Sequence, residues 1–366
     1  MTSTTDLAGT SQQTEAQSFR ARHEANHLYS IWDRQEELRQ PQQRCIPFVW
    51  RWEDIFPLLT EATSIVNLHQ TDRRAFILAN PGLAPHHATT ATLYASYQIV
   101  LPGETAEVHR HTPSASRFIL QSTGGYTTVE GEKCTMQRGD LIVTPNGTWH
   151  DHGNDGEGPA IWVDVLDLPL VEYLGATKFD LQYFETSAET GTPERRSAQS
   201  VTEPAHSENA YGFAGMLPTF LSHSRGENPL ATPKFVYRWS DVETMLSRLS
   251  DYHGSPYDGV KVEYRNPVTG GPLTPAMDFS MQMLRAGERT KSHRHTSSTV
   301  YTCLEGSGQT IVGETTIEWR ENDSFAIPPW AWHQHTNPRS DDRALLYSVS
   351  DAPLAQKLGL YREEAA

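Results

Sequence analysis

Pairs of histidines separated by one residue are the most chemically suggestive feature of this sequence. His109 and His111 stand in "EVHRHT", and His150 and His152 stand in "TWHDHGN". Successive side chains of a strand face opposite sides, so H-x-H places both imidazoles on one face. The strand-like run "GDLIVTP" before His150 allows a hairpin that returns His150 to the pair. Three neutral imidazoles suit Fe(II), Zn(II), Mn(II), Ni(II) or Cu(II) and leave coordination positions open. The sequence therefore predicts a catalytic metal site at His109, His111 and His150.

The same pattern occurs a second time. "PGETAEVHRHT" is matched by "AGERTKSHRHT", and "PNGTWHDHGN" by "PPWAWHQHTN". This internal repeat predicts two similar domains, and His293, His295 and His333 form a possible second metal site. His152 and His335 lie two residues after the third ligand of each set. We expect them to contact substrate or the metal ligands rather than the metal.

Composition excludes several classes of protein. A formal net charge of −15, with no basic run, offers nucleic acid no binding surface. The polar N-terminus has no signal-peptide core and no later apolar run is long enough to cross a bilayer, so a soluble, cytoplasmic protein is expected. Cys45, Cys134 and Cys303 are too few and too scattered for a disulfide framework, and we interpret them as reduced structural thiols.

The pattern of apolar residues indicates helices followed by strands. Helical spacing is seen over 19–40 and 51–62, and short Val-, Ile-, Thr- and Tyr-rich runs separated by turns begin at Arg74. Ser240 and Glu243 have capping-box spacing before another helical stripe. The predicted parts are an N-terminal helical arm (1–72), a first β barrel with the catalytic metal (73–184), a linker and surface excursion (185–235) and a second β barrel (236–366).

The two histidine motifs resemble those of a known superfamily. "GETAEVHRH" and "PNGTWHDHGN" resemble the two motifs of cupins, which are double-stranded β-helix barrels, and the repeat implies an all-β bicupin. Many cupins carry a glutamate ligand after H-x-H, but this chain has Ala115, Ser116 and Arg117 there. A three-histidine subfamily is therefore indicated, and glutamate-requiring cupins such as the oxalate decarboxylases fit poorly.

A more specific resemblance is to the gentisate 1,2-dioxygenase family, which includes salicylate and 1-hydroxy-2-naphthoate dioxygenases. "RRAFILANPGL", "HRHTPSASRF", "GDLIVTPNGTWHDHGN", "WVDVLDLP" and "NPVTGGPLTP" are similar to that family's motifs, in its order. The resemblance implies that His109, His111 and His150 hold Fe(II). It implies cleavage of an ortho-hydroxybenzoate, with gentisate favoured, by O2 between the carboxyl-bearing and hydroxyl-bearing carbons. It also implies a homo-oligomer, a tetramer in the family, and no organic cofactor.

Arginine's planar fork suits the substrate carboxylate. The resemblance implies that Arg117 supplies it, although the odd spacing from His111 requires a bend at "TPSAS". Arg73 is the second candidate, and its choice over Arg74 rests on the resemblance alone. The family's remaining active-site positions fall on Tyr94 and Gln98 for substrate binding, on Asp164, and on His152, which would contact substrate and assist proton movement.

The two repeats differ at one decisive position, because Tyr301 stands where the first repeat has Arg117. We expect both barrels to hold metal and only the first to turn over an aromatic acid. Salicylates and 1-hydroxy-2-naphthoate remain alternative substrates. More distant alternatives are an oxygen-independent decarboxylase or isomerase, which would want a carboxylate after His111, and a storage or sensor bicupin, which would be secreted or carry a DNA-binding segment.

Overall fold

The computed structural model describes residues 5–39, 44–68, 71, 73–181, 184–186, 193–195, 205–213, 215–221 and 231–366. Contacts divide the chain into two compact units, Met1–Gln43 and Arg44–Ala366. The first unit holds α1 (Thr5–Ala25) and two short 3-10 helices (Ile31–Arg34 and Glu37–Arg39). The prediction of one helical run over 19–40 is therefore wrong. The α-helix ends at Ala25, and His27 follows with a left-handed φ of 56°, which a continuing helix does not allow.

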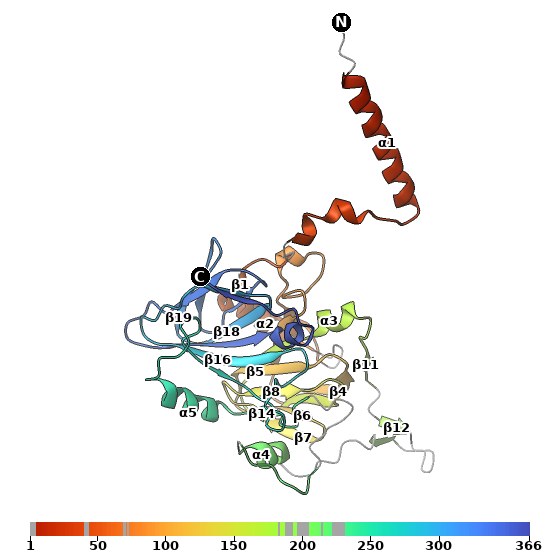
Figure 1. Cartoon of the computed structure of the whole chain (residues 1–366). Coiled ribbons are helices and arrows are strands. Elements are labelled where there is room, and N and C mark those ends of the chain that lie inside the picture. The colour runs from red at the N-terminus through yellow and green to blue at the C-terminus, as the bar shows by residue number, and fades with distance from the viewer. Residues whose placement is uncertain are drawn as a thin grey trace. The chain divides into compact units, whose positions relative to one another are not determined.

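The second unit contains two barrels, each built from one six-stranded and one five-stranded antiparallel sheet (Figure 1). The six-stranded sheet of the first barrel runs in the order β14 (Val236–Tyr237), β8 (Leu141–Thr144), β5 (Ala115–Gln121), β10 (Ala160–Leu166), β3 (Tyr94–Val100) and β2 (Ala75–Ile77). Its five-stranded sheet runs β11 (Phe179–Asp180), β4 (Thr105–His111), β9 (His150–Asn154), β6 (Gly125–Val129) and β7 (Glu132–Thr135).

The second barrel repeats this arrangement, as the internal repeat predicted. Its six-stranded sheet runs β1 (Phe48–Trp50), β21 (Ser324–Ile327), β18 (Thr299–Glu305), β23 (Ala344–Ser350), β16 (Asp278–Leu284) and β15 (Val260–Glu263). Its five-stranded sheet runs β20 (Thr315–Arg320), β19 (Ser307–Val312), β22 (His333–Thr336), β17 (His293–His295) and β24 (Glu363–Ala365). The all-β prediction with an N-terminal helix is confirmed.

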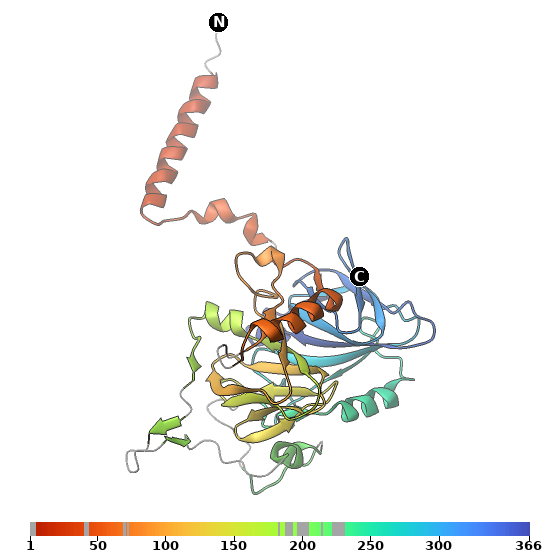
Figure 2. The ribbon, with the colours of Figure 1, turned by 180° about the vertical axis from the view of Figure 1, so that it is seen from behind.

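The remaining elements connect the barrels or lie beside them. The helices are α2 (Trp52–Ile65), α3 (Leu168–Tyr173), α4 (His206–Tyr211), α5 (Trp239–Leu249) and α6 (Ala352–Lys357), with a 3-10 turn at Pro81–Leu83. Seen from behind, α2 lies across the strands (Figure 2). The Trp52 ring of α2 is 5.4 Å from that of Tyr97 on β3. Much of the predicted linker and excursion at 185–235 lies outside the described residues, which here include the hairpin β12 (Phe184–Thr186) and β13 (Pro193–Arg195). In the described part of the chain, no helix is both long and apolar enough to cross a membrane.

In each barrel, one edge strand of the six-stranded sheet comes from outside the barrel's own stretch of sequence. β1 precedes the first barrel in sequence but pairs with β21 of the second, with Val49 opposite Phe325. β14 immediately precedes the second barrel's helix α5 but pairs with β8 of the first, with Val236 opposite Ile142. The two barrels are thus joined by a reciprocal exchange of edge strands.

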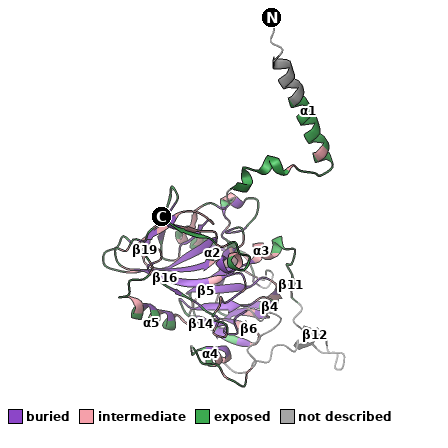
Figure 3. Ribbon diagram, viewed as in Figure 1, coloured by how far each residue is buried: buried purple, intermediate pink, exposed green. Residues whose placement is uncertain are grey.

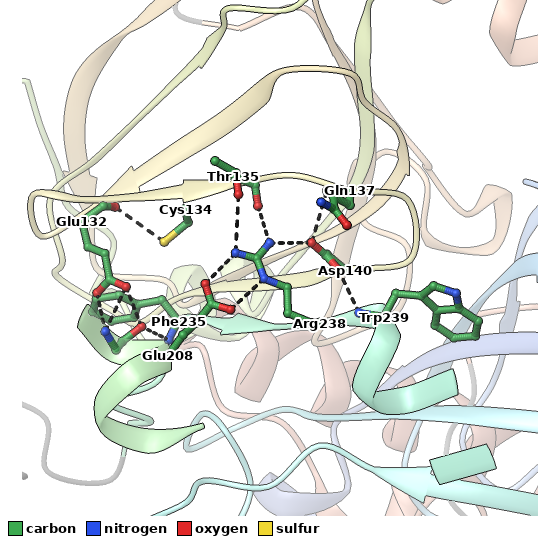
Figure 4. A network of polar contacts seen from close by, with 10 residues as sticks. Glu132, Cys134, Thr135, Gln137, Asp140, Glu208, Phe235, Arg238 and Trp239 are labelled. Carbon is green, nitrogen blue, oxygen red and sulfur yellow. Dashed lines mark hydrogen bonds and ion pairs between the residues drawn. The ribbon is translucent and has the colours of Figure 1, made fainter. Parts of the chain in front are cut away.

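Each exchanged strand is followed by a helix, and the first turn of that helix is capped by an aspartate of the barrel that the strand joins. Asp140 accepts a hydrogen bond from the backbone N of Trp239 at 2.8 Å and forms an ion pair with Arg238 at 2.7 Å. Arg238 also pairs with Glu208 on α4 at 2.5 Å, so one guanidinium links α4, α5 and the first barrel (Figure 4). The predicted capping box is wrong: the N-cap of α5 is Arg238 and Ser240 lies inside the helix, because Asp140 satisfies the first turn.

The corresponding arrangement holds α2 to the second barrel. Asp323 accepts from the backbone N of Trp52 at 2.7 Å and pairs with Arg51 at 3.2 Å. "FVWRWEDIF" and "FVYRWSDVE" are therefore two copies of one structural unit. In each copy an Arg-Trp pair begins a helix, and an aspartate of the barrel that the preceding strand joins binds the arginine side chain and the tryptophan backbone N.

Buried residues are concentrated in the strands of both barrels (Figure 3). One apolar cluster crosses the boundary between them and includes residues of β3, β5 and β10 as well as β16 and β23. At its centre Phe118 of β5 and Tyr347 of β23 stack in parallel, with ring centroids 4.0 Å apart and 3° between the planes. The barrels consequently share a core. Cys45, Cys134 and Cys303 are free and buried, in agreement with their interpretation as reduced thiols.

Phe118→Ala is expected to destabilise the chain by about 3–5 kcal/mol, because the substitution leaves a cavity where both stacked rings are almost fully buried. The free energy of unfolding in urea measures this. Phe76→Ala removes a ring from β2 of the same barrel that is 41% exposed, and should cost far less. Equal losses from the two variants would show that the stack does not join the barrels.

Candidate metal centre and its surroundings

Two neighbouring strands carry the first histidine cluster. β4 contributes His109 and His111, and β9 contributes His150 and His152. His109 lies opposite His150 in the antiparallel register, with ring centroids 4.3 Å apart, and the His111 ring is 4.8 Å from that of His150. All four histidines are buried. Strand alternation therefore gathers them on the inner face of the barrel, as the H-x-H spacing predicted.

Backbone carbonyl groups fix the orientation of the three predicted ligands. The Nδ1 atoms of His109, His111 and His150 lie 2.8, 2.7 and 3.0 Å from the carbonyl oxygens of Glu107, Pro113 and Thr148. A carbonyl oxygen can only accept, so each Nδ1 carries the proton and each Nε2 keeps its lone pair for a metal. Nε2 of His150 is buried and lacks a hydrogen-bond partner in the described part of the chain. This donor set fits a transition-metal ion.

One group of three histidines in this cluster differs by one residue from the predicted ligands, because it contains His152 in place of His111. The ligand atoms of His109, His150 and His152 lie within 4.8 Å of one another. Both ring nitrogens of His152, however, have side-chain partners, whereas His111 is oriented by a backbone carbonyl in the same way as His109 and His150. The hydrogen bonding therefore favours His111 as the third ligand over His152.

Arg117 lies beside this cluster. β4 ends at His111 and β5 begins at Ala115, so the chain bends between them, as the resemblance required. In the guanidinium of Arg117, Nη2 lies 3.2 Å from Nε2 of His152 and Nε lies 3.4 Å from Oδ1 of Asp164. It also donates to the hydroxyl of Thr144. These contacts fix its plane, and only 3% of Arg117 is exposed.

The same contacts define the tautomer of His152. Because Arg117 can only donate, Nε2 of His152 must accept. Nδ1 then carries the proton and donates to the hydroxyl of Thr127 at 2.9 Å. The lone pair of His152 is therefore at Nε2, where it accepts from Arg117 beside the other three histidines of the cluster.

Arg73 and Arg74 have different environments. The Arg73 side chain reaches the cluster, where it donates to Nε2 of His109 at 2.6 Å. Arg74 is buried elsewhere and pairs with Glu104. Of the two arginines, the structure therefore brings Arg73 to the histidine cluster and pairs Arg74 with a carboxylate. The Arg73 guanidinium also lies 6.0 Å from the ring centroid of Phe179, which covers this side of the cluster.

Burial and the nearby arginines keep the cluster uncharged. Burial, followed by the charge of Arg73, lowers the pKa of His109 to about 3. Burial, followed by Arg117, holds the pKa of His152 well below its ordinary value. Burial raises the pKa of the Asp164 carboxyl, although Arg117 opposes this effect, and lowers the pKa of Arg117 to about 10, which still leaves a cation at neutral pH. Neutral imidazoles beside a cation can accept a metal and an organic anion together.

The other predicted site residues lie on β3, which pairs with β10 in the first barrel. Gln98 lies on β3 opposite Trp162 in the register with β10, and its buried amide nitrogen has no hydrogen-bond partner among the described residues. Tyr94 begins β3 and is half-buried. Burial, followed by the charge of Asp164, raises the pKa of the Tyr94 phenol.

Sequence reasoning missed the residues that orient these groups. Thr127 and Thr144 hold His152 and Arg117, and Nε1 of Trp162 donates to Asp164 at 2.9 Å. One signal for Thr127 was available: in the repeat "GYTTV" aligns with "GQTIV", and Thr310 of the second copy lies 2.9 Å from Nδ1 of His335.

The second cluster is arranged similarly. His293 and His295 on β17 and His333 on β22 have ligand atoms within 4.8 Å of one another. Tyr301 lies opposite Ser348 in the register of β18 and β23, the position at which Arg117 lies opposite Asp164 in the first barrel. The second barrel therefore has the histidines without the arginine and carboxylate pair.

Comparison with known protein families gives two matches within the chain. The Cupin domain family matches residues 96–166 and 280–350. Each stretch contains one of the two histidine clusters, and each falls inside one of the two barrels.

Curated relatives cover most of the chain. It is 36% identical over 332 residues to the 5-aminosalicylate 1,2-dioxygenase of Comamonas sp, a match that spans 89% of this chain and 83% of that protein. It is 35% identical to gentisate 1,2 dioxygenase 1 of Aquipseudomonas alcaligenes, spanning 95% and 96%. Among solved structures, salicylate 1,2-dioxygenase from Pseudoaminobacter salicylatoxidans in adducts with gentisate matches with a TM-score of 0.84 and 27% identity, spanning 96% of this chain and 94% of that one.

Proposed function

Because the chain belongs to the gentisate 1,2-dioxygenase family of ring-cleaving bicupins, we propose that gentisate is its preferred substrate and Fe(II) its metal. The reaction opens the aromatic ring between the carboxyl-bearing carbon and the adjacent hydroxyl-bearing carbon, with both atoms of O2 entering the product. For gentisate that product is maleylpyruvate. The observation that carries the proposal is the buried Arg117 cation next to the histidine cluster, because it offers a carboxylate partner where a metal could hold the phenolic oxygen.

His109, His111 and His150 would hold the metal through Nε2. Bound Fe(II) would supply open coordination positions for chelation of an ortho-hydroxybenzoate and for activation of dioxygen. In the structure Arg73 donates to Nε2 of His109, so this arginine must release that nitrogen when metal binds. Its cation is then available to the substrate carboxylate, which gives Arg73 a role in coupling metal binding to substrate binding.

Arg117 and His152 act on the substrate directly. Arg117 binds the carboxylate, and Asp164 and Thr144 keep its guanidinium plane fixed before substrate arrives, which reduces the entropic cost of orientation. His152 can accept from a substrate hydroxyl at Nε2 once Arg117 turns from that nitrogen to the substrate carboxylate, because its Nδ1 proton is already donated to Thr127.

Gln98 and Tyr94 complete the substrate pocket. The amide nitrogen of Gln98, which has no hydrogen-bond partner among the described residues, is a donor suited to a second substrate oxygen. Tyr94, at the start of β3, would pack along the ring. Phe179 adds an apolar surface on the side of His111, at a ring distance of 5.3 Å. Such walls favour a flat aromatic acid over an aliphatic one.

A second candidate substrate is 5-aminosalicylate, since one relative of the chain bears that name. Both compounds carry an electron-donating group para to the phenolic hydroxyl, which makes the ring easier to oxidise. They differ at the fifth ring position alone, where gentisate has a hydroxyl and 5-aminosalicylate has an amine. The arginines do not distinguish them, because both present the same carboxylate and ortho hydroxyl.

The test is oxygen uptake by protein loaded anaerobically with Fe(II) and offered gentisate, 5-aminosalicylate, salicylate and 1-hydroxy-2-naphthoate in turn. Absorbance follows formation of the ring-cleaved oxo acid. We expect stoichiometric uptake of O2, with the highest kcat/KM for gentisate. Faster turnover of another acid would replace gentisate as the substrate. No uptake with any of the four, from protein that contains iron, would contradict the proposal.

We further propose a cytoplasmic homo-oligomer, a tetramer as in the family. Along the sequence we propose part boundaries at residues 72, 184 and 235, and the strands β1 and β14 pair across them. The free, buried thiols support a reducing compartment. Five large apolar side chains of the first unit are each more than 60% exposed: Leu28, Tyr29, Ile31, Trp32 and Leu38. An exposed apolar group of this size is typical of a surface that contacts a partner. Sedimentation velocity of the whole chain measures the assembly.

A further inference from the structure

The second histidine cluster has the features of a metal site in its own right. The ring centroids of His293, His295 and His333 are 5.6, 4.4 and 5.0 Å apart in pairs. Nδ1 of His295 lies 2.9 Å from the carbonyl oxygen of Ser297, and Nδ1 of His333 lies 2.9 Å from that of Ala331. Both rings therefore present Nε2 to the interior. Nε2 of His333 is buried with no hydrogen-bond partner in the described part of the chain, which is costly unless a ligand binds it.

The third histidine is oriented by a carboxylate. Oε1 of Glu363 lies 3.4 Å from Nδ1 of His293, and the Tyr361 hydroxyl donates to the other carboxylate oxygen at 3.2 Å. A carboxylate behind a histidine raises the basicity of the opposite nitrogen and strengthens its bond to a metal. Glu363 belongs to β24, which pairs with β17 so that Glu363 lies opposite His295.

The surroundings of the second cluster suit a cation and disfavour an aromatic acid. Glu363 lies opposite His295 as Phe179 lies opposite His111 in the first barrel, so a carboxylate replaces an aromatic ring. Tyr301 replaces Arg117, as described above. On the other side of His293, the Tyr257 ring stacks at 5.3 Å.

Lys261 on β15 of the second barrel already has a carboxylate partner. Asp258 follows Tyr257 in the chain and holds Lys261 at 3.1 Å. An anionic substrate would therefore meet Glu363 and Asp258 with one neutralised lysine, whereas in the first barrel it meets two arginines and one carboxylate. The local charge at the second cluster favours a divalent cation.

We propose that His293, His295 and His333 form a second metal centre, which binds a divalent transition-metal ion and fixes β24 to β17 through Glu363. The centre is separate from the catalytic one in the first barrel. Because β24 contributes three residues to the edge of its sheet, a metal that orders His293 and Glu363 also orders this strand.

The experiment counts metal ions in the whole chain. Protein freed of metal is dialysed against Zn(II) alone, and bound zinc is measured by atomic absorption in the wild type, His150→Ala, His333→Ala and the double variant. The expected results are two ions for the wild type, one for each single variant and none for the double variant. His253→Ala, which removes an exposed histidine of the second half, should keep both ions. One ion in the wild type, or two in His333→Ala, would overturn the proposal.

A second measurement separates metal binding from a folding defect. Deuterium uptake by residues 363–365 should slow on zinc loading in the wild type and in His150→Ala, but not in His333→Ala. His295→Gln, which preserves most of the side-chain volume, should behave as His333→Ala does while keeping the circular dichroism of the wild type. Slowing in His295→Gln equal to that of the wild type would show that β24 is ordered without the second centre. Neither measurement depends on the identity of the substrate.

Discussion

His150→Ala is expected to lower kcat by more than about 100-fold, because it removes a metal ligand, and changes to the outer partners of ligands already cost 10- to 100-fold. The His150 ring is close to both His109 and His111, at 4.3 and 4.8 Å, and its Nε2 is buried without a partner in the described part of the chain. Steady-state oxygen uptake with gentisate measures kcat, and iron analysis of the same sample reports whether the metal is lost.

The matched control is His333→Ala, which removes the equivalent histidine of the second barrel. Since Tyr301 and Ser348 replace the arginine and carboxylate pair there, this variant should retain much more turnover than His150→Ala. Comparable losses from two folded variants would contradict the assignment of catalysis to the first barrel alone. A fall in iron content without a fall in kcat for His150→Ala would exclude that histidine as the catalytic ligand.

Arg117→Met is expected to lower kcat/KM for gentisate by about 10- to 150-fold, the equivalent of about 1.5–3 kcal/mol for hydrogen bonds to a charged group. Arg117 is 3% exposed and lies between Asp164 and His152. The methionine fills similar volume but cannot bind a carboxylate. Arg117→Lys keeps the cation without the planar fork, so its activity should fall between those of the wild type and the methionine variant.

A control for this substitution must separate binding from folding. Arg248→Met removes an exposed arginine from α5 and should leave kcat/KM unchanged. In Arg117→Met, Asp164 loses one partner but still accepts from Trp162, so thermal unfolding should change less than activity. Equal kcat/KM values for Arg117→Met and the wild type would exclude Arg117 as the carboxylate partner.

The positions of the histidines followed from local rules. An H-x-H pair in a strand shares one face, and the repeat located both clusters, which the registers of His109 with His150 and His293 with His333 confirm. The direction of the Arg117 side chain could not be predicted from such a rule. Its inward direction depends on the bend between β4 and β5, which strand periodicity does not encode and which the family resemblance supplied.

The helix caps were beyond local reasoning for a different reason. Ser240 and Glu243 have capping-box spacing, yet Asp140 from the other half of the chain accepts from the first turn of α5. A contact between residues so far apart in sequence leaves no mark on the spacing within the helix. The only trace of this contact in the sequence is the repeated "RW" at Arg51 and Arg238. The repeat is explained once the structure shows which barrel supplies the aspartate that binds each arginine.

The exchange of edge strands also imposes an order on biosynthesis. A ribosome releases residues 73–180 before it has made β14 and α5, so the nascent first barrel carries an uncovered edge at β8 and an Asp140 without its helix. The second barrel differs, because β1 and α2 are translated before it. They are therefore already present when β21 and Asp323 are made. The nascent first barrel is therefore the stage most exposed to misassembly and chaperone capture. Slower translation just before residue 236 would prolong it.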